Sequence, residues 1–156
     1  MIALRGAQAG DLAAIRCLVE AAYTPWIAAI GRRPGPMDDD YAARIEAGEA
    51  VVAEEAGTIV GLLVTERHDG FLLLDNLAVA PGCQGRGIGR ALLEAAEDQA
   101  RRAGLPRLRL YTHARMATNI ALYARAGFAE IARVSEKGFD RVYMEKPLAA
   151  AEGGAR

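Results

Sequence analysis

An apolar segment of this chain leads straight into a glycine-rich turn, and the turn opens the most regular helical pattern in the sequence. Residues 71–80 are almost continuously apolar, which is typical of a strand covered on both faces. The turn follows as Gln84-Gly85-Arg86-Gly87-Ile88-Gly89, and residues 87–103 then show helical spacing that ends at Gly104. A strand, a turn and a helix in this order predict an α/β or α+β domain around one sheet.

The glycine-rich turn is an expected anion-binding site. Glycines let the backbone approach a ligand closely, and the N–H groups at the start of a helix attract negative charge. Arg86 and Arg90 add positive charge, so we expect a pyrophosphate to bind here. The alternative is that the glycines only permit a tight turn and close helix packing. A P-loop is excluded because the turn lacks Gly-Lys-Ser/Thr, and a dinucleotide fingerprint requires glycine where Arg90 stands.

Periodicity predicts the other elements. Residues 11–23 have the spacing of an amphipathic helix with Asp11 as its N-cap, whereas residues 24–40 are rich in proline and glycine and are expected to form a loop with short helical turns. Further expectations are helices over 38–47 and 118–126 and strands over 2–5, 50–54, 59–66, 108–112, 129–135 and 139–145. We expect a single domain over residues 1–148 and a disordered tail over 149–156.

Composition narrows the setting and the partners. Cys17 and Cys83 are far apart and belong to no Cys/His cluster, so we expect no metal site, no disulfide and a reducing, cytoplasmic setting. The net charge of −1 indicates no nucleic-acid partner. No signal-peptide pattern is present and no apolar run approaches the roughly 20 residues of a membrane span, so we expect no membrane partner.

Two motifs together resemble a known family. The pattern Gln84-x-x-Gly87-x-Gly89 after Leu77-Ala78-Val79 is similar to the pyrophosphate motif of the GNAT superfamily of N-acetyltransferases, and residues 119–128 resemble its second motif. The resemblance implies a central mixed sheet of about seven strands with helices on both faces. It also implies acetyl-CoA as cosubstrate and transfer of its acetyl group to a primary amine by direct attack on the thioester. A non-catalytic acyl-CoA-binding regulatory protein and an enzyme for longer acyl groups remain alternatives.

The resemblance also implies where the coenzyme binds. The pantetheine arm would lie along the backbone of the apolar strand, with the acyl carbonyl near the Val79 N–H, which would stabilise the oxyanion formed during attack. Asn119 matches a coenzyme-contacting asparagine, although many family members carry it three positions earlier, where this chain has Met116. The expected coenzyme-binding residues are Leu77, Ala78, Val79, Gln84, Gly85, Arg86, Gly87, Ile88, Gly89, Arg90 and Asn119.

Two residues are candidates for proton transfer. Tyr123 matches the family's general acid, which protonates the departing thiolate; the alternative is an aromatic ring that packs in the core. Asp75 lies within an apolar strand on the same face as Val79, so it is a candidate general base, and equally a carboxylate that caps a loop or pairs with an arginine. The two histidines, His68 and His113, suggest no nucleophilic triad.

The acceptor site is the least defined part. Trp26, Arg32 and Tyr111 are expected to contact the acceptor, with Tyr41 and His113 as further candidates. The acidic run at residues 38–40 is either a solvated helix start or an attraction for a cationic acceptor. Small-molecule amines, peptide N-termini and lysine side chains all stay open as acceptors, and a homodimer is plausible from exposed strand edges and from the family's habits.

Overall fold

The computed structural model describes residues 1–149, which divide into two compact units. The first unit comprises Met1–Thr65 and Asn76–Leu93, and the second comprises Glu66–Asp75 and the described residues from Glu94 onward. Strands β3 (Thr58–His68) and β4 (Phe71–Val79) and helix α3 (Ile88–Arg102) each begin in one unit and end in the other. The expected single domain stays a prediction, and the expected disordered tail lies outside the described residues except for residue 149.

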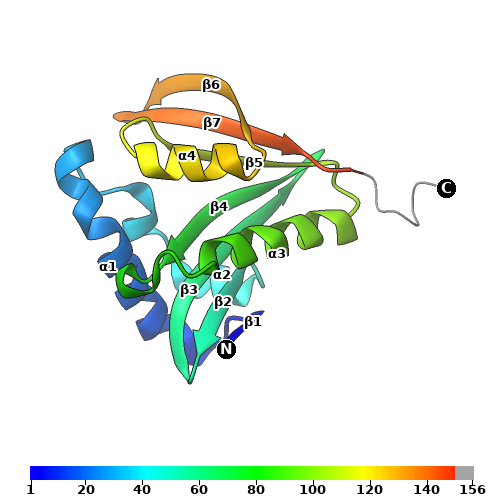
Figure 1. Cartoon of the computed structure of the whole chain (residues 1–156). Coiled ribbons are helices and arrows are strands. Elements are labelled where there is room, and N and C mark those ends of the chain that lie inside the picture. The colour runs from blue at the N-terminus through cyan, green and yellow to red at the C-terminus, as the bar shows by residue number, and fades with distance from the viewer. Residues whose placement is uncertain (150–156) are drawn as a thin grey trace. The chain divides into compact units, whose positions relative to one another are not determined.

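All seven strands belong to one mixed sheet in the order β1-β2-β3-β4-β5-β7-β6 (Figure 1). The other strands are β1 (Ile2–Gly6), β2 (Ala50–Glu55), β5 (Arg107–His113), β6 (Ala129–Glu136) and β7 (Phe139–Pro147). Strands β4 and β5 run parallel, whereas β1–β2, β2–β3, β5–β7 and β6–β7 are antiparallel. The prediction of a mixed sheet of about seven strands is confirmed.

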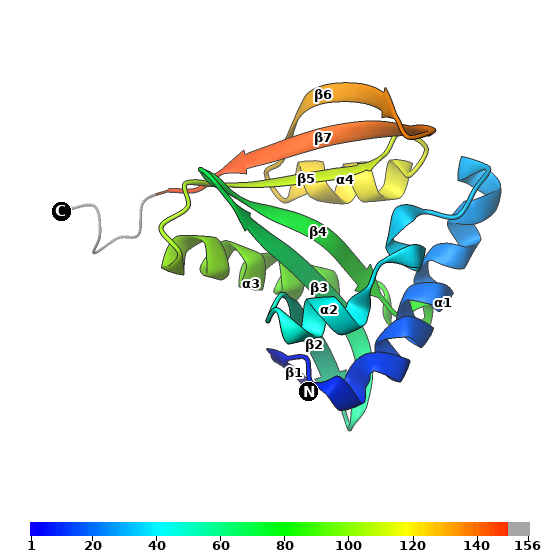
Figure 2. The same ribbon diagram turned by 180° about the vertical axis from the view of Figure 1, so that it is seen from behind.

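Helices cover both faces of the sheet within the first unit (Figures 1 and 2). Helices α1 (Leu12–Ile30) and α2 (Tyr41–Glu46) lie on the face to which Asn76 of β4 points. Helix α3 lies on the opposite face, where a Cβ on Gly61 of β3 would come within 3.0 Å of Ile88 and 3.1 Å of Leu92. Glycine at position 61 therefore lets the start of α3 approach the sheet closely, and this packing fixes where the glycine-rich turn lies.

The second unit is built on the strand pairs β4–β5, β5–β7 and β6–β7. Leu108, Leu110, Val142 and Met144 form its buried core. The Lys146 ammonium on β7 lies 2.7 Å from the Glu97 carboxylate on the second half of α3 and connects these two elements. Helix α4 (Ala117–Arg125) lies close to its predicted range and carries the second motif.

Helix α1 is longer than its sequence pattern predicted. The expected loop at residues 24–40 is wrong over residues 24–30, because the helix continues through Pro25 to Ile30 and ends at Gly31 (φ 88°). Thr24 donates its hydroxyl proton to the Glu20 carbonyl at 2.5 Å within this stretch. The Asp11 side chain does not cap the helix; it pairs with Arg5 at 2.8 and 3.0 Å and accepts the Gln8 N–H at 2.7 Å.

The segment that contains α1 is a longer apolar stretch than the sequence analysis expected. Ala9–Ile30 is long and apolar enough to cross a membrane by length and composition alone, with a mean hydropathy of 1.2, and 22% of that window is buried. The expectation that no run approaches a membrane span is therefore wrong, because many alanines and few charges raise the average. Ile15, Leu18, Val19 and Tyr23 are nevertheless buried in the first unit, so one side of this helix packs as a core helix does.

Candidate active site

The glycine-rich turn has the backbone that an anion site needs. Gly85 and Gly87 have φ values of 81° and 85°, which favour glycine, and a Cβ at either position would meet nothing within 4 Å. Helix α3 begins directly after them at Ile88, which is 2% exposed and anchors the turn to the core. The N–H groups of a helix's first turn have no partner within the helix, so this open turn can present backbone donors to a ligand.

The arginines of the turn differ in their surroundings. Arg86 and Arg90 are both exposed, as a role at an anion site requires. The Arg86 guanidinium forms an ion pair and a hydrogen bond with the Glu55 carboxylate at the end of β2. The pKa of Glu55 lies below its ordinary value, chiefly because of this hydrogen bond. The sequence did not indicate Glu55 as part of this site, since 31 residues separate it from Arg86.

The end of β4 lies beside the start of α3. A Cβ on Gly89 would lie 3.8 Å from Val79 and 3.9 Å from Leu77, so these side chains face the first turn of the helix. Ala78 points the opposite way and is 3% exposed. The structure thus brings residues 77–79 and 84–90 together in the first unit, as the coenzyme prediction requires, while Asn119 is half-buried on α4 in the second unit.

Strand β4 has a neighbouring strand on each side. The register of β4 with β5 contains the pairs Leu72–Leu108, Leu73–Arg109 and Leu74–Leu110. Strand β4 continues for five further residues, to Val79. On the other side, the Ala80 N–H donates to the Val60 carbonyl of β3 at 2.9 Å.

Tyr123 lies on α4 in the second unit and is buried. Its side chain is 6% exposed and meets Phe128 edge to face, with 5.8 Å between ring centroids. Burial raises the pKa of Tyr123 to about 12, because the phenolate would lose its hydration. Tyr123 does pack against an aromatic neighbour, and its hydroxyl stays protonated at neutral pH.

Asp75 and Tyr111 are close enough in the second unit to influence each other. The pKa of Tyr111 is raised first by burial and then by the Asp75 carboxylate, which repels a phenolate. The Tyr111 ring lies 5.6 Å from that of Tyr143, and the Arg141 guanidinium stands over it at 4.5 Å. These side chains form a cluster of aromatic and charged groups, so Asp75 has charged neighbours within the sheet.

The remaining candidates fall on separate elements. Trp26 is half-buried on α1, and Arg32 is exposed just after that helix. His113 is buried, and its Nδ1 accepts the Arg115 N–H at 3.1 Å, which identifies a structurally satisfied histidine. Burial lowers the pKa of His113. Among the described residues, no group of three or more His, Cys, Asp or Glu side chains could hold a metal ion.

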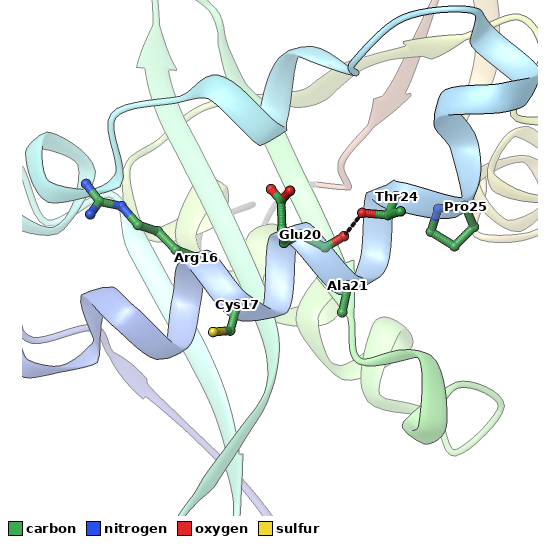
Figure 3. A pocket seen from close by; sticks show the side chains of 6 residues that line it. All are labelled: Arg16, Cys17, Glu20, Ala21, Thr24 and Pro25. Carbon is green, nitrogen blue, oxygen red and sulfur yellow. Dashed lines mark hydrogen bonds between the residues drawn. The ribbon is translucent and has the colours of Figure 1, made fainter.

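An open groove follows the exposed side of α1 and contains none of the predicted catalytic or coenzyme-binding residues. Figure 3 shows that its six lining residues extend along one side of the helix: Arg16, Cys17, Glu20, Ala21, Thr24 and Pro25. The buried face of α1 carries Tyr23, whose hydroxyl donates to Asn76 Oδ1 at 2.5 Å. The sequence did not identify Tyr23 as a site candidate, because 53 residues separate the two partners.

The family model and the related sequences that match this chain are all those of acetyltransferases. A model of the acetyltransferase (GNAT) family matches residues 14–128. The chain is 41% identical over 102 residues to the IAA acetyltransferase of Azospirillum brasilense. The aligned region covers 63% of this chain and 67% of that protein. It is 44% identical over 62 residues to the mycothiol acetyltransferase of Beutenbergia cavernae, covering 40% of this chain and 21% of that protein, so it spans about a fifth of the latter's length.

The fold has counterparts among solved structures. The PaiA N-acetyltransferase of Thermoplasma acidophilum, in complex with coenzyme A, aligns with a TM-score of 0.80 over 95% of this chain and 99% of that chain. The two sequences are 20% identical, so the similarity is one of fold.

Proposed function

Because this chain belongs to the GNAT family of acetyl-CoA-dependent N-acetyltransferases, we propose that it transfers the acetyl group of acetyl-CoA to a primary amine by direct attack on the thioester. The observation that carries this proposal is the open turn at Gly85 and Gly87, which begins α3 beside the end of β4. A helix start with exposed backbone donors and nearby arginine charge suits the pyrophosphate of coenzyme A.

The coenzyme is proposed to follow the strand and the turn. Residues 84–90 bind the pyrophosphate, and the pantetheine arm runs along the backbone of Leu77, Ala78 and Val79. Leu77 and Val79 lie beside Gly89 in the first turn of α3, which supports a role for these residues next to the proposed pyrophosphate site. The Val79 N–H then donates to the acetyl oxygen, whose negative charge grows as the amine attacks. Asn119 is proposed as a further coenzyme contact.

Tyr123 is proposed to assist the departing thiolate. As the amine nitrogen bonds to the carbonyl carbon and the carbon–sulfur bond breaks, the sulfur gains a charge that a proton or hydrogen bond must neutralise. A pKa of about 12 keeps the phenol protonated, yet it makes the phenol a weaker acid than a thiol, whose pKa is about 8.5. The contribution of Tyr123 is therefore a hydrogen bond to the developing thiolate, and the sulfur leaves as a thiolate that takes its proton from water.

Asp75 is proposed to accept the proton that the amine loses, directly or through water. An alkylamine with a pKa of about 10 is mostly protonated at neutral pH, so a nearby carboxylate both attracts the ammonium form and assists its deprotonation. The influence of Asp75 on Tyr111 supports placing the acceptor amine near these two residues. Trp26 and Arg32 are proposed to contact the remainder of the acceptor.

The acceptor is proposed to be a small molecule or a peptide that carries a primary amine. The setting is proposed to be the cytoplasm, with no membrane or nucleic-acid partner, and both cysteines are free thiols as a reducing compartment favours. A homodimer is proposed as the assembly; the edge strand β6, which is exposed from Ala129 to Ser135, supports an association through the sheet.

Calorimetric titration with acetyl-CoA tests the proposal, with free CoA and NAD as ligands for comparison. We expect both CoA species to bind in the micromolar range, about −8 kcal/mol, and NAD to bind far more weakly. A panel of amines with detection of released CoA thiol then tests turnover. Binding without turnover on any amine would favour a non-catalytic acyl-CoA-binding protein, and absence of CoA binding would refute the proposed function.

A further inference from the structure

One buried side chain of β4 is polar where its neighbours on the same face are apolar. Asn76 is 3% exposed, and the adjacent buried positions along the strand are Leu72, Leu74 and Ala78. A buried amide is costly unless its oxygen and nitrogen are both satisfied. Both are satisfied here, by tyrosine hydroxyls from two different helices.

The hydrogen bonds have a fixed direction. The Tyr41 hydroxyl donates its proton to the Pro36 carbonyl at 2.5 Å, because a carbonyl can only accept. Tyr41 therefore accepts from Asn76 Nδ2 at 2.9 Å, which leaves Asn76 Oδ1 to accept from the Tyr23 hydroxyl at 2.5 Å. Position 76 must accept on one side and donate on the other, and an amide satisfies that demand.

This chain of hydrogen bonds joins distant segments at the start of the proposed pantetheine strand. Tyr23 comes from α1, Tyr41 begins α2, and Pro36 lies in the short 3-10 helix Gly35–Asp38. Asn76 immediately precedes Leu77, whose carbonyl oxygen is also 3.5 Å from the Tyr23 hydroxyl. The four residues thus connect the segment after α1 to the backbone on which the thioester is proposed to lie.

We propose that Tyr23, Asn76 and Tyr41 are positioning residues for acetyl transfer, which hold the backbone of Leu77–Val79 in the orientation that directs the Val79 N–H at the acetyl oxygen. The inference rests on the proposed function. Apolar side chains would fill the same space and give at least as much stability. A directional hydrogen-bond chain, in contrast, permits one arrangement, and an oxyanion donor loses its effect when its orientation shifts.

Asn76→Asp gives the sharpest test, because the protonation state of the new carboxyl group controls the direction of the hydrogen bonds to Tyr23 and Tyr41. A protonated carboxyl group accepts from Tyr23 and donates to Tyr41 as the amide does, whereas a carboxylate can only accept. Burial raises the pKa of such a carboxyl group. We expect the variant-to-native ratio of kcat to be near one at about pH 5.5 and to fall roughly tenfold by about pH 8.5, with acetyl-CoA affinity within about twofold throughout.

A second measurement needs no acceptor. In the acetyl-CoA complex of Asn76→Asp, the backbone amide NMR signals of Leu77, Ala78 and Val79 should shift with pH along the same titration, and those of the native complex should not. Ile15→Val is the matched control: Ile15 is fully buried on the same side of α1, and the substitution costs about 0.5–1.5 kcal/mol without touching a hydroxyl. This control should leave the kcat ratio independent of pH.

Tyr41→Phe should lower kcat at every pH, because Asn76 Nδ2 then loses its acceptor, while Kd for acetyl-CoA changes by less than about twofold. A pH-independent ratio together with unshifted amide signals in Asn76→Asp would overturn the positioning role. Failure of the native protein to bind acetyl-CoA would instead refute the proposed function, and the two failures are distinguished by the titration alone.

Discussion

The Arg86 guanidinium of the glycine-rich turn forms an ion pair and a hydrogen bond with the Glu55 carboxylate at the end of strand β2. An arginine that was expected to bind an anion therefore already has an acidic partner within the protein. The pair is partly exposed, with 46% of the Arg86 side chain and 26% of the Glu55 side chain accessible to solvent. A coenzyme pyrophosphate must therefore compete with Glu55 for this cation, or bind beside a carboxylate that repels it.

Glu55→Gln should tighten acetyl-CoA binding. The substitution removes the competing charge, and solvent screens a pair this exposed, so Kd should fall by at most about fivefold at low salt. Calorimetry at two ionic strengths measures the effect, which should shrink at high salt. Glu54→Gln is the matched control because Glu54 pairs with Arg5. Equal or weaker binding by Glu55→Gln would show that Arg86 does not meet the coenzyme.

Gly87→Glu should abolish coenzyme binding. The position has φ 85°, which a side chain resists, and the added carboxylate would stand where the pyrophosphate is proposed to bind. We expect a loss of at least about 100-fold in affinity, or roughly 2.7 kcal/mol. Gly48→Glu carries the same charge at φ 73° in an equally open position and should leave affinity within about twofold. Retained binding by Gly87→Glu would contradict the anion site.

Tyr123→Phe should lower kcat and leave Kd for acetyl-CoA within about threefold. The ring still packs on Phe128, but the thiolate loses its donor, so kcat should fall about 10- to 100-fold. Phe128→Leu controls for packing, since it disturbs the Tyr123 ring and keeps the hydroxyl. Because the pKa of Tyr123 is about 12, ionisation of this phenol should produce no decline in native kcat up to about pH 10. Unchanged kcat in Tyr123→Phe would exclude the donor role.

Asp75→Asn should lower the pKa of Tyr111 and reduce turnover at neutral pH. The Asp75 carboxylate disfavours the Tyr111 phenolate, so its removal makes the phenol easier to ionise. Phenolate absorbance during an alkaline titration reports this shift, and a Tyr111→Phe background should abolish it.

The expected loss in kcat/KM for Asp75→Asn is about 10- to 100-fold near pH 7. Glu130→Gln serves as the control, because Glu130 lies on the exposed strand β6 and pairs with Arg133. A lowered Tyr111 pKa together with normal turnover in Asp75→Asn would show that Asp75 acts on its neighbours electrostatically and is not the general base.

Local patterns determined much of what this protein is. The apolar run ending at Val79, the glycines at 85 and 87 and the helical spacing after them act over a few residues, so the sequence alone indicated the mixed sheet, the turn and the family. The same local reasoning was wrong about residues 24–30, where the helix continues through Pro25. It placed Asp11 correctly at the N-cap position of α1, but the carboxylate pairs with Arg5 instead of capping that helix.

Only the tertiary structure decided how the polar groups are partnered. Asn76 is a polar residue of an apolar strand, and its partners Tyr23 and Tyr41 are 53 and 35 residues away, so no spacing rule connects them. Glu55 lies 31 residues before Arg86 and reaches it because β2 ends near the turn. Backbone conformation follows from neighbouring residues, whereas the partner of a buried amide or of a guanidinium follows from how strands and helices pack, which the sequence encodes only through the whole fold.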